Sequence, residues 1–219
     1  MNEADRQIKV ALIEPHYLPS LEFFCSILSF DKLVLEVTEH YVKQTYRNRC
    51  YINTDKGIQV LTVPIVKPTT KIIMMSARID SQSNWQNIHW RSIQSAYAKA
   101  PFFEHYSDKL KNIIYYEHEF LVDLNAALLS FCLANLKLTI PISETMSYEN
   151  NVGKEITDLR NTIIAKNQSE SSTFYQPITY LQVFGNAFVK NLSLIDLLFC
   201  AGPDSLRILR TSQKIDLNK

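Results

Sequence analysis

The sequence predicts an α/β fold: a βαβ-containing mixed sheet with a helical middle segment packed on it. Residues 8–14 and 32–37 are near-continuous apolar runs, which are typical of buried parallel strands. Between them, residues 21–30 carry apolar side chains at helical spacing, and Ser20 belongs to a residue type that caps helix N-termini. A strand, a helix and a strand in this order make a βαβ unit with a right-handed crossover.

A β-hairpin is expected after this unit. Residues 51–53 and 59–63 are mostly β-branched or aromatic, as strands tend to be. The residues between them include Asp55 and Gly57, which tolerate the backbone angles of a tight reversal. The apolar character of residues 71–79 predicts one more strand.

The pattern then becomes helical. Apolar residues recur at spacings of three and four, which predicts helices at 84–99, 102–116 and 119–138. Pro101 separates the first two of these helices.

The last third of the chain has a more varied pattern. We expect a short strand, a polar stretch with few signals of regular structure, an aromatic stretch that holds a strand, a helix and a frayed tail. The helix should end at Gly202 and Pro203. In order, these segments are 139–142, 145–172, 174–184, 191–202 and 214–219.

Length and composition fit one domain. The chain has 219 residues, of which 46% are hydrophobic and 21% charged, so it can bury a substantial core. We expect a single α/β domain over residues 1–219. Its parts are an α/β part with the hairpin (1–83), a helical part (84–138) and a C-terminal strand, loop and helix (139–219).

Charge and cysteine usage restrict the compartment and the partners. A formal net charge of +1 makes bulk electrostatic binding to nucleic acid or to a membrane unlikely. The N-terminus begins with acidic residues and does not resemble a secretory signal, and no apolar run approaches the roughly 18 residues of a membrane span. The four cysteines lie far apart, which favours reduced core residues. We expect a cytoplasmic protein without a metal.

Polar side chains that could perform chemistry gather directly after the second predicted strand. In βαβ units, ligands sit at the C-terminal ends of the strands. His16, which follows the first strand, belongs to the same edge. The group after the second strand comprises Glu36, Glu39, His40, Lys43, Gln44, Arg47, Asn48 and Arg49. We therefore predict a binding site here, held between rigid elements.

The arginines of this group suit an anion. Arg47 and Arg49 offer forks of donors to phosphate or carboxylate, and Lys43 adds a mobile charge. The alternative is an exposed basic face that pairs with nearby glutamates. If residues 46–51 form an extended strand, Arg47 and Arg49 point to one face and Asn48 to the other. With four glycines and no Gly-rich phosphate loop, a phosphate would be held by side chains or by a helix end.

Two histidines are candidates for acid–base chemistry, with Glu36 or Glu39 as the orienting carboxylate. His16 lies before a helix N-terminus and could bind phosphate or exchange a proton near neutral pH, but it could equally pack in its loop. His89 shares a helix face with Trp85, which could stack on a base or a sugar. Both could instead dock their helix on the sheet.

Further candidates for ligand contact lie later in the chain. Tyr97 lies on the same helix as Trp85. Tyr180 and Gln182 alternate along a predicted strand, so they could form a pocket wall or pack on the core. Asp196 lies on an apolar helix, where it is either a buried hydrogen-bonding anchor or a site carboxylate.

Segments spread over nearly the whole chain resemble the WbqC-like family of bacterial proteins. They are Pro15-His16-Tyr17-Leu18-Pro19, Lys43-Gln44 with Arg47-Asn48-Arg49, Gly57 to Pro64, Trp85 with His89, Ile93 to Tyr97 with Ala100 to Phe103, Tyr180 with Gln182, and Leu192 to Phe199 with Gly202. The resemblance implies a bacterial cytoplasmic protein. Family members occur among genes for surface-polysaccharide assembly, which implies a role in modifying nucleotide-linked sugars. The polar stretch 145–172 replaces a Gly-rich, Tyr-containing family segment, so the chain resembles a short variant whose activity could be altered.

Three functions are compatible with these observations. The first is a group-transfer enzyme acting on a phosphorylated or nucleotide-linked, sugar-like small molecule, which requires a histidine and a carboxylate that converge on the arginines. The second is a non-catalytic small-molecule-binding or accessory protein, which needs the arginines and aromatics alone. The third is a nucleic-acid-modifying or binding protein, which predicts a basic stripe through Lys67, Lys71 and Arg78. The sequence leaves the cofactor and the oligomeric state open.

Overall fold

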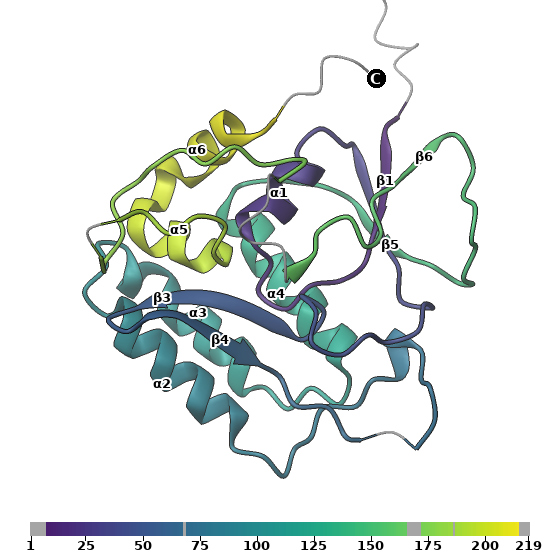
Figure 1. The fold of residues 1–219 in the computed structure, drawn as a ribbon, viewed down its shortest axis with the longest axis horizontal. Coiled ribbons are helices and arrows are strands. Elements are labelled where there is room, and N and C mark those ends of the chain that lie inside the picture. The colour runs from purple at the N-terminus through teal and green to yellow at the C-terminus, as the bar shows by residue number, and fades with distance from the viewer. Residues whose placement is uncertain (1–7, 68, 166–171, 186, 215–219) are drawn as a thin grey trace, which may run out of the picture.

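The computed structural model describes residues 8–67, 69–165, 172–185 and 187–214. Its strands form a parallel sheet in the order β5-β2-β1-β6 and a separate antiparallel pair, β3-β4 (Figure 1). The parallel sheet consists of β1 (Val10–Ile13), β2 (Lys32–Leu35), β5 (Ile142–Glu144) and β6 (Ile156–Asp158). The predicted α/β class is confirmed, and the two strand directions are divided between two sheets.

The N-terminal βαβ unit forms as predicted. Helix α1, Leu21–Ile27, connects β1 to β2, which pair in parallel with Val10 opposite Lys32. Ser20 caps the helix, because its side chain accepts a hydrogen bond from the Phe23 N–H at 3.4 Å. Every residue of α1 is buried, so the crossover helix belongs to the core.

The two outer strands of the sheet differ from the prediction. β5 begins at Ile142, whereas the strand expected from the sequence begins at residue 139. β6 lies within the stretch 145–172, where no strand is expected. Each outer strand has three residues, which is too short for a visible alternation of apolar and polar side chains. These strands form because the backbone edges of β2 and β1 require partners.

The predicted hairpin is confirmed as β3 (Arg49–Thr54) and β4 (Gly57–Thr62). Gly57 has a φ of +94°, a backbone conformation that disfavours side chains. The strand expected at 71–79 is wrong. That segment holds a short 3₁₀ helix, η2 (Met74–Ser76), and its backbone bonds reach several separate segments, so no ladder forms.

The helical middle segment is confirmed as three helices: α2 (Trp85–Tyr97), α3 (Phe103–Tyr115) and α4 (Leu121–Asn135). The hairpin lies along α2 and α3 in Figure 1. Asn53 N–H of β3 donates to the Tyr97 hydroxyl of α2 at 3.2 Å, which fixes the hairpin on this helix.

The C-terminal helix is confirmed as α5, Leu194–Ala201. A 3₁₀ turn, η4 (Gly202–Asp204), leads into an unpredicted helix, α6 (Ser205–Ser212), which lies with α1 and α5 on one side of the molecule (Figure 1). The strand expected within 174–184 is wrong, since the described part of it forms one isolated bridge, Tyr175 with Gln213. The tail expected to fray lies outside the described residues beyond Lys214.

The core is one cluster of buried apolar side chains from the sheet, the hairpin and the helices. All four cysteines are buried thiols. Within the described ranges, no helix combines the length and apolar character of a membrane span. In the same residues, no group of three or more His, Cys, Asp or Glu side chains is placed to hold a metal ion.

Candidate functional site

Charged side chains gather at the carboxyl ends of the parallel strands. Glu14 directly follows β1, Glu36 directly follows β2, and Asp158 ends β6. Parallel strands bring these ends to one edge, where α/β proteins commonly bind ligands. We call Glu14, His16, Glu36, Glu39, Arg47 and Arg160 the buried charge cluster, because their side chains are almost inaccessible to solvent.

Arg47 is the hub of this cluster. Its Nε donates to Glu39 Oε1 at 2.6 Å, its Nη2 donates to Asn161 Oδ1 at 2.9 Å, and its Nη1 lies 3.6 Å from Glu14 Oε1. Asn161 also donates its backbone N–H to Glu14 Oε2 at 2.9 Å. The guanidinium therefore has protein partners on each side, and residues after β6 complete its shell.

The two carboxylates around Arg47 respond differently to burial. Burial alone would raise the pKa of Glu14, but its hydrogen bond with His16 and the charges of His16 and Arg47 lower it to about 2. Burial also raises the pKa of Glu39, and here the Arg47 ion pair opposes the effect without reversing it. Glu14 is thus the stable anion of the pair.

His16 lies within hydrogen-bond reach of one carboxylate and has one unpartnered nitrogen. Its Nε2 is 3.4 Å from Glu14 Oε1, and its ring stacks on Tyr46 with centroids 5.2 Å apart. Burial lowers the pKa of His16, although the bond to Glu14 opposes this. The buried Nδ1 has no hydrogen-bond partner, so His16 keeps one position for a proton or a ligand.

Glu36 is saturated with donors. Its Oε1 accepts from the Thr38 N–H at 2.9 Å, from Thr38 Oγ1 at 2.7 Å and from Thr145 Oγ1 at 2.8 Å. Its Oε2 accepts from Arg160 Nη1 at 3.0 Å. Arg160 also donates two hydrogen bonds to the carboxylate of Asp158, at 2.9 and 2.7 Å. Glu36 ties β2, β5 and β6 together at the sheet edge.

A pocket of about 870 Å³ is lined in part by the residues that directly follow Glu39 and Arg47 in the sequence. It is formed by the turn after His40, the start of the hairpin and the segment that follows β4. We call it the cationic pocket. It is lined by His40, Tyr41, Val42, Lys43, Gln44, Asn48, Arg49, Thr62, Val63, Pro64, Ile65, Lys67, Thr70, Lys71 and Ile72. Its volume lies in the range of about 300–1,000 Å³ typical of small-molecule sites.

The pocket carries positive charge without a compensating carboxylate. Lys43, Arg49, Lys67 and Lys71 line it, and none of the described lining residues is acidic. No described carboxylate lies within ion-pair distance of these four side chains. The Arg49 Nε is buried and lacks a hydrogen-bond partner. Such a one-signed pocket attracts anions.

Residues 39–41 and 47–49 separate the two features, and we call them the dividing wall. Glu39 and Arg47 belong to the buried charge cluster, whereas Asn48 and Arg49 line the cationic pocket. Tyr41 lies within electrostatic range of both arginines. Burial raises its pKa to about 12, while the positive charges of Arg49 and Arg47 oppose the shift.

Arg47 and Arg49 were expected to point to the same face if residues 46–51 formed an extended strand. This condition is not met, because β3 begins only at Arg49. The preceding turn includes Gln44 with a φ of +65°. Arg47 lies in this turn and points into the cluster, so the two arginines reach different surroundings. Lys43, Asn48 and Arg49 lie together at the cationic pocket.

His89 and Trp85 belong neither to the buried charge cluster nor to the lining of the cationic pocket. His89 Nδ1 is 2.8 Å from the Tyr17 hydroxyl, and its ring meets the edge of Trp85 with centroids 5.2 Å apart. Burial lowers the pKa of His89 to about 4, opposed by a hydrogen bond to the Thr62 backbone. These contacts dock α2 on the loop after β1 and on β4.

Tyr97, Tyr180 and Gln182 meet at Asp196. The hydroxyls of Tyr97 and Tyr180 donate to the two oxygens of Asp196 at 2.9 and 2.5 Å, and Gln182 Nε2 donates at 3.1 Å. Asp196 has no exposed surface. The tyrosines and the glutamine predicted to contact a ligand therefore converge on one buried carboxylate, which joins α2, α5 and the segment before α5.

The three residues of the basic stripe expected for a nucleic-acid protein are Lys67, Lys71 and Arg78, and they line two different pockets. Arg78 Nη2 lies 2.6 Å from Glu119 Oε1, at a separate pocket of about 560 Å³ that Trp85 and His118 also line. Lys67 and Lys71 belong to the cationic pocket instead.

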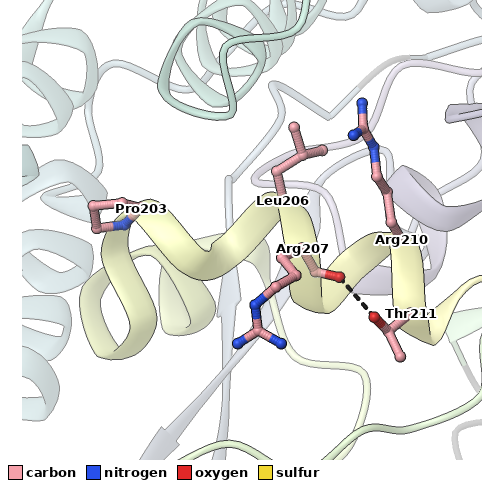
Figure 2. A pocket seen from close by; sticks show the side chains of 5 residues that line it. All are labelled: Pro203, Leu206, Arg207, Arg210 and Thr211. Carbon is pink, nitrogen blue, oxygen red and sulfur yellow. Dashed lines mark hydrogen bonds between the residues drawn. The ribbon is translucent and has the colours of Figure 1, made fainter.

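A smaller pocket of about 460 Å³ lies on α6. Figure 2 shows that its arginines, Arg207 and Arg210, extend in different directions. Arg207 is also paired with Asp204 at 3.1 Å. The two arginines are therefore not arranged to bind one anion together.

A comparison with known protein families covers the part of the chain that holds both features. The sequence profile of the WbqC-like protein family matches residues 14–177. The chain belongs to the WbqC-like protein family. In this WbqC-like protein, the matched range contains the buried charge cluster and the cationic pocket, and it ends before α5 and α6.

One relative of this WbqC-like protein is the uncharacterized protein Rv1507c of Mycobacterium tuberculosis. The two sequences are 31% identical over 148 residues, which cover 67% of this chain and 64% of the relative. The chain therefore matches less than two thirds of the relative's length. No solved structure matches.

Sequence reasoning did not assign a site role to several residues that the structure brings to these two features. Glu14, Arg160 and Asn161 complete the buried charge cluster. Lys67 and Lys71, which were expected only in the basic stripe of a nucleic-acid protein, line the cationic pocket. The position of Glu14 at the end of a predicted parallel strand was a usable signal. The partners after β6 carried no such signal, because β6 itself was not predicted.

Proposed function

We propose that this WbqC-like protein is a group-transfer enzyme that binds a phosphorylated or nucleotide-linked, sugar-like small molecule in the cationic pocket. The proposal rests mainly on four cations that line the pocket without a carboxylate among the described lining residues. One of these cations, Arg49, has a buried Nε without a hydrogen-bond partner. An arginine donor in this state is costly to bury unless an acceptor arrives. A phosphate oxygen supplies that acceptor together with negative charge.

Catalysis would draw on the buried charge cluster. The enzyme hypothesis expects a histidine and a carboxylate to converge on the arginines. His16, Glu14 and Glu39 surround Arg47, whereas Arg49 lies at the cationic pocket. In a transfer, an acceptor hydroxyl oxygen would form the new bond and give up its proton to a base. The leaving group would keep the electrons of the broken bond, and its negative charge would stay against the pocket cations. Of the two candidate histidines, His16 has an unpartnered nitrogen that could serve as this base.

The family resemblance suggests a ligand from surface-polysaccharide assembly, for which a nucleotide-linked sugar is the chemical class. Such a molecule combines phosphate charge with a polar body, and the pocket offers charged and uncharged lining for both. This assignment belongs to the proposal.

A second candidate function is a non-catalytic binding protein that uses the same pocket. It is favoured by the composition of the pocket lining, because His16, Glu14 and Glu39 are buried and do not line the pocket. Under this alternative the buried charge cluster holds the wall in shape.

The binding proposal is tested by thermal-shift screening against nucleotides, nucleotide sugars and sugar phosphates. A ligand at 100 times its Kd should stabilise the protein by about 2.7 kcal/mol. Arg49→Gln should abolish the shift, whereas Arg91→Gln, the same change on an exposed face of α2, should retain it. If the ligand raises the melting temperature of both variants equally, the proposed phosphate binding by Arg49 is wrong.

The catalytic part needs a separate readout. The ligand that binds is incubated with the wild type and candidate acceptor sugars, and new phosphorus species are followed by ³¹P NMR. A group-transfer enzyme produces them, and His16→Gln slows their formation while Arg49-dependent binding remains. Binding without any turnover supports the non-catalytic alternative.

A further inference from the structure

We infer that the ligand of the cationic pocket is a diphosphate joined to an uncharged body that has an apolar face and at least one O–H or N–H donor. Nucleoside diphosphates and sugar diphosphates have this chemistry. The inference rests on the proposed phosphate-binding function and adds the class of ligand. Three features of the pocket carry it: two pairs of cations, an apolar lining and an unpartnered amide oxygen.

The cations come in two pairs from separate parts of the chain. Lys43 and Arg49 belong to the turn after β2 and to the first residue of β3, whereas Lys67 and Lys71 belong to the segment after β4. One phosphate group carries a charge of about −1.5 to −2 at neutral pH, which one pair can neutralise. Four cations around one pocket without a described acidic neighbour therefore suit two linked phosphates, one for each pair.

The pocket has more room and more apolar surface than a diphosphate alone can use. Its volume is about 870 Å³. Val42, Pro64, Ile65 and Ile72 are among its lining residues, and Val42 is 46% exposed. Covering such side chains with an uncharged part of the ligand is favourable, because apolar surface leaves water. The ligand thus has a body as well as phosphates.

Asn48 shows that this body carries a hydrogen-bond donor. Asn48 lines the pocket and is 5% exposed, and its Nδ2 donates to the backbone oxygen of Val63 at 3.0 Å. That bond fixes the orientation of the amide, since a carbonyl oxygen can face only the NH₂ group. The remaining Oδ1 is buried and has no partner. A hydroxyl or N–H of the ligand would satisfy it.

The ligand class is tested by calorimetric titration at fixed ionic strength. The probes are inorganic phosphate, pyrophosphate, uridine monophosphate, uridine diphosphate and geranyl diphosphate, which has two phosphates and an apolar body but no donor. We expect uridine diphosphate to bind at least about tenfold more tightly than each of the others. Phosphate and uridine monophosphate lose charge-assisted bonds, pyrophosphate has no body to cover the apolar lining, and geranyl diphosphate leaves the buried Asn48 Oδ1 without a donor.

Matched variants locate the binding. Lys43→Gln/Arg49→Gln and Lys67→Gln/Lys71→Gln should each weaken uridine diphosphate binding by about tenfold or more. The control Lys99→Gln/Lys154→Gln removes two exposed charges outside the pocket and should leave the affinity within about twofold of the wild type. Far-ultraviolet circular dichroism verifies that each variant is folded.

Different failures have different meanings. Equal binding of uridine monophosphate and diphosphate, or binding that ignores Lys67 and Lys71, overturns the diphosphate inference while Arg49-dependent phosphate binding stands. Geranyl diphosphate binding as tightly as uridine diphosphate overturns the requirement for a donor. Binding of phosphorylated probes that does not depend on Arg49 overturns the proposed function itself.

Discussion

Arg47 and Arg49 are two residues apart in the dividing wall but belong to different features of the molecule. Arg47 Nε is 2.6 Å from Glu39 Oε1 inside the buried charge cluster, whereas Arg49 Nε is buried at the cationic pocket without a partner. Similar side chains therefore have different surroundings. Arg47 is satisfied by the protein, and Arg49 still has a donor to offer.

This difference predicts that mutating the two arginines changes stability by different amounts. Arg47→Met should lower the free energy of unfolding by about 3–5 kcal/mol, because it leaves Glu14 and Glu39 buried without their cation. Arg49→Gln should change it by less than about 1 kcal/mol, since no ion pair is lost. Urea denaturation at neutral pH measures both. An Arg47→Met protein as stable as the wild type would contradict the ion-pair network.

Glu14 should make stability depend on pH in the acid range. Its folded-state pKa of about 2 lies below its ordinary value of 4.5, so the folded state prefers the ionised form. The resulting stabilisation, about 3 kcal/mol, is complete above pH 4.5 and is lost as the pH falls towards 2.

The measurement compares wild type with Glu14→Gln. The difference between their free energies of unfolding should narrow as the pH falls from about 4.5 to about 2. This comparison cancels the other carboxylates, which titrate in both proteins. A difference that is constant over this range would show that Glu14 titrates alike in the folded and unfolded states.

His89 should remain neutral well below the usual histidine range. Burial lowers its pKa to about 4 from 6.5, so protonation favours the unfolded state. Stability from this group is complete above pH 6.5 and is lost as the pH falls towards 4. Nuclear magnetic resonance titration of the imidazole protons reads this directly. A midpoint for His89 near 6.5 would place its ring in contact with water.

Asp196 should matter for stability through its tyrosine partners. Asp196→Asn replaces one of the two acceptor oxygens with an NH₂ group, which cannot accept a hydrogen bond. At least one of the three donors Tyr97, Tyr180 and Gln182 then lacks its acceptor. We expect the unfolding free energy to fall by about 2–4 kcal/mol.

Tyr180→Phe provides the matched comparison. It removes one hydroxyl from the same carboxylate, leaves the others in place and should cost only about 1–2 kcal/mol. Thermal and urea denaturation of both variants measure the contrast. If Asp196→Asn is less harmful than Tyr180→Phe, Asp196 is not the anchor of this network.

Local patterns were sufficient for much of the fold. The βαβ unit, the hairpin with Gly57 and helices α2 to α4 each follow from residues close in sequence, through hydrophobic periodicity, a cap or a turn. The outer strands β5 and β6 did not, because each depends on the backbone edge of a distant strand. The apolar segment 71–79 was assigned to a strand, but the described residues pair with it only through isolated bridges.

The sequence by itself determined that the polar residues after β1 and β2 reach the carboxyl edge of the sheet, because the ends of these strands and the turn after β2 are local features. Only the tertiary structure decided their surroundings. It buried Arg47 among Glu14, Glu39 and Asn161, and it brought Lys67 and Lys71 to Arg49. Electrostatic partners are chosen by distance in space. Arg47 lies in the turn before β3 and Arg49 in β3, so two residues close in sequence have different partners.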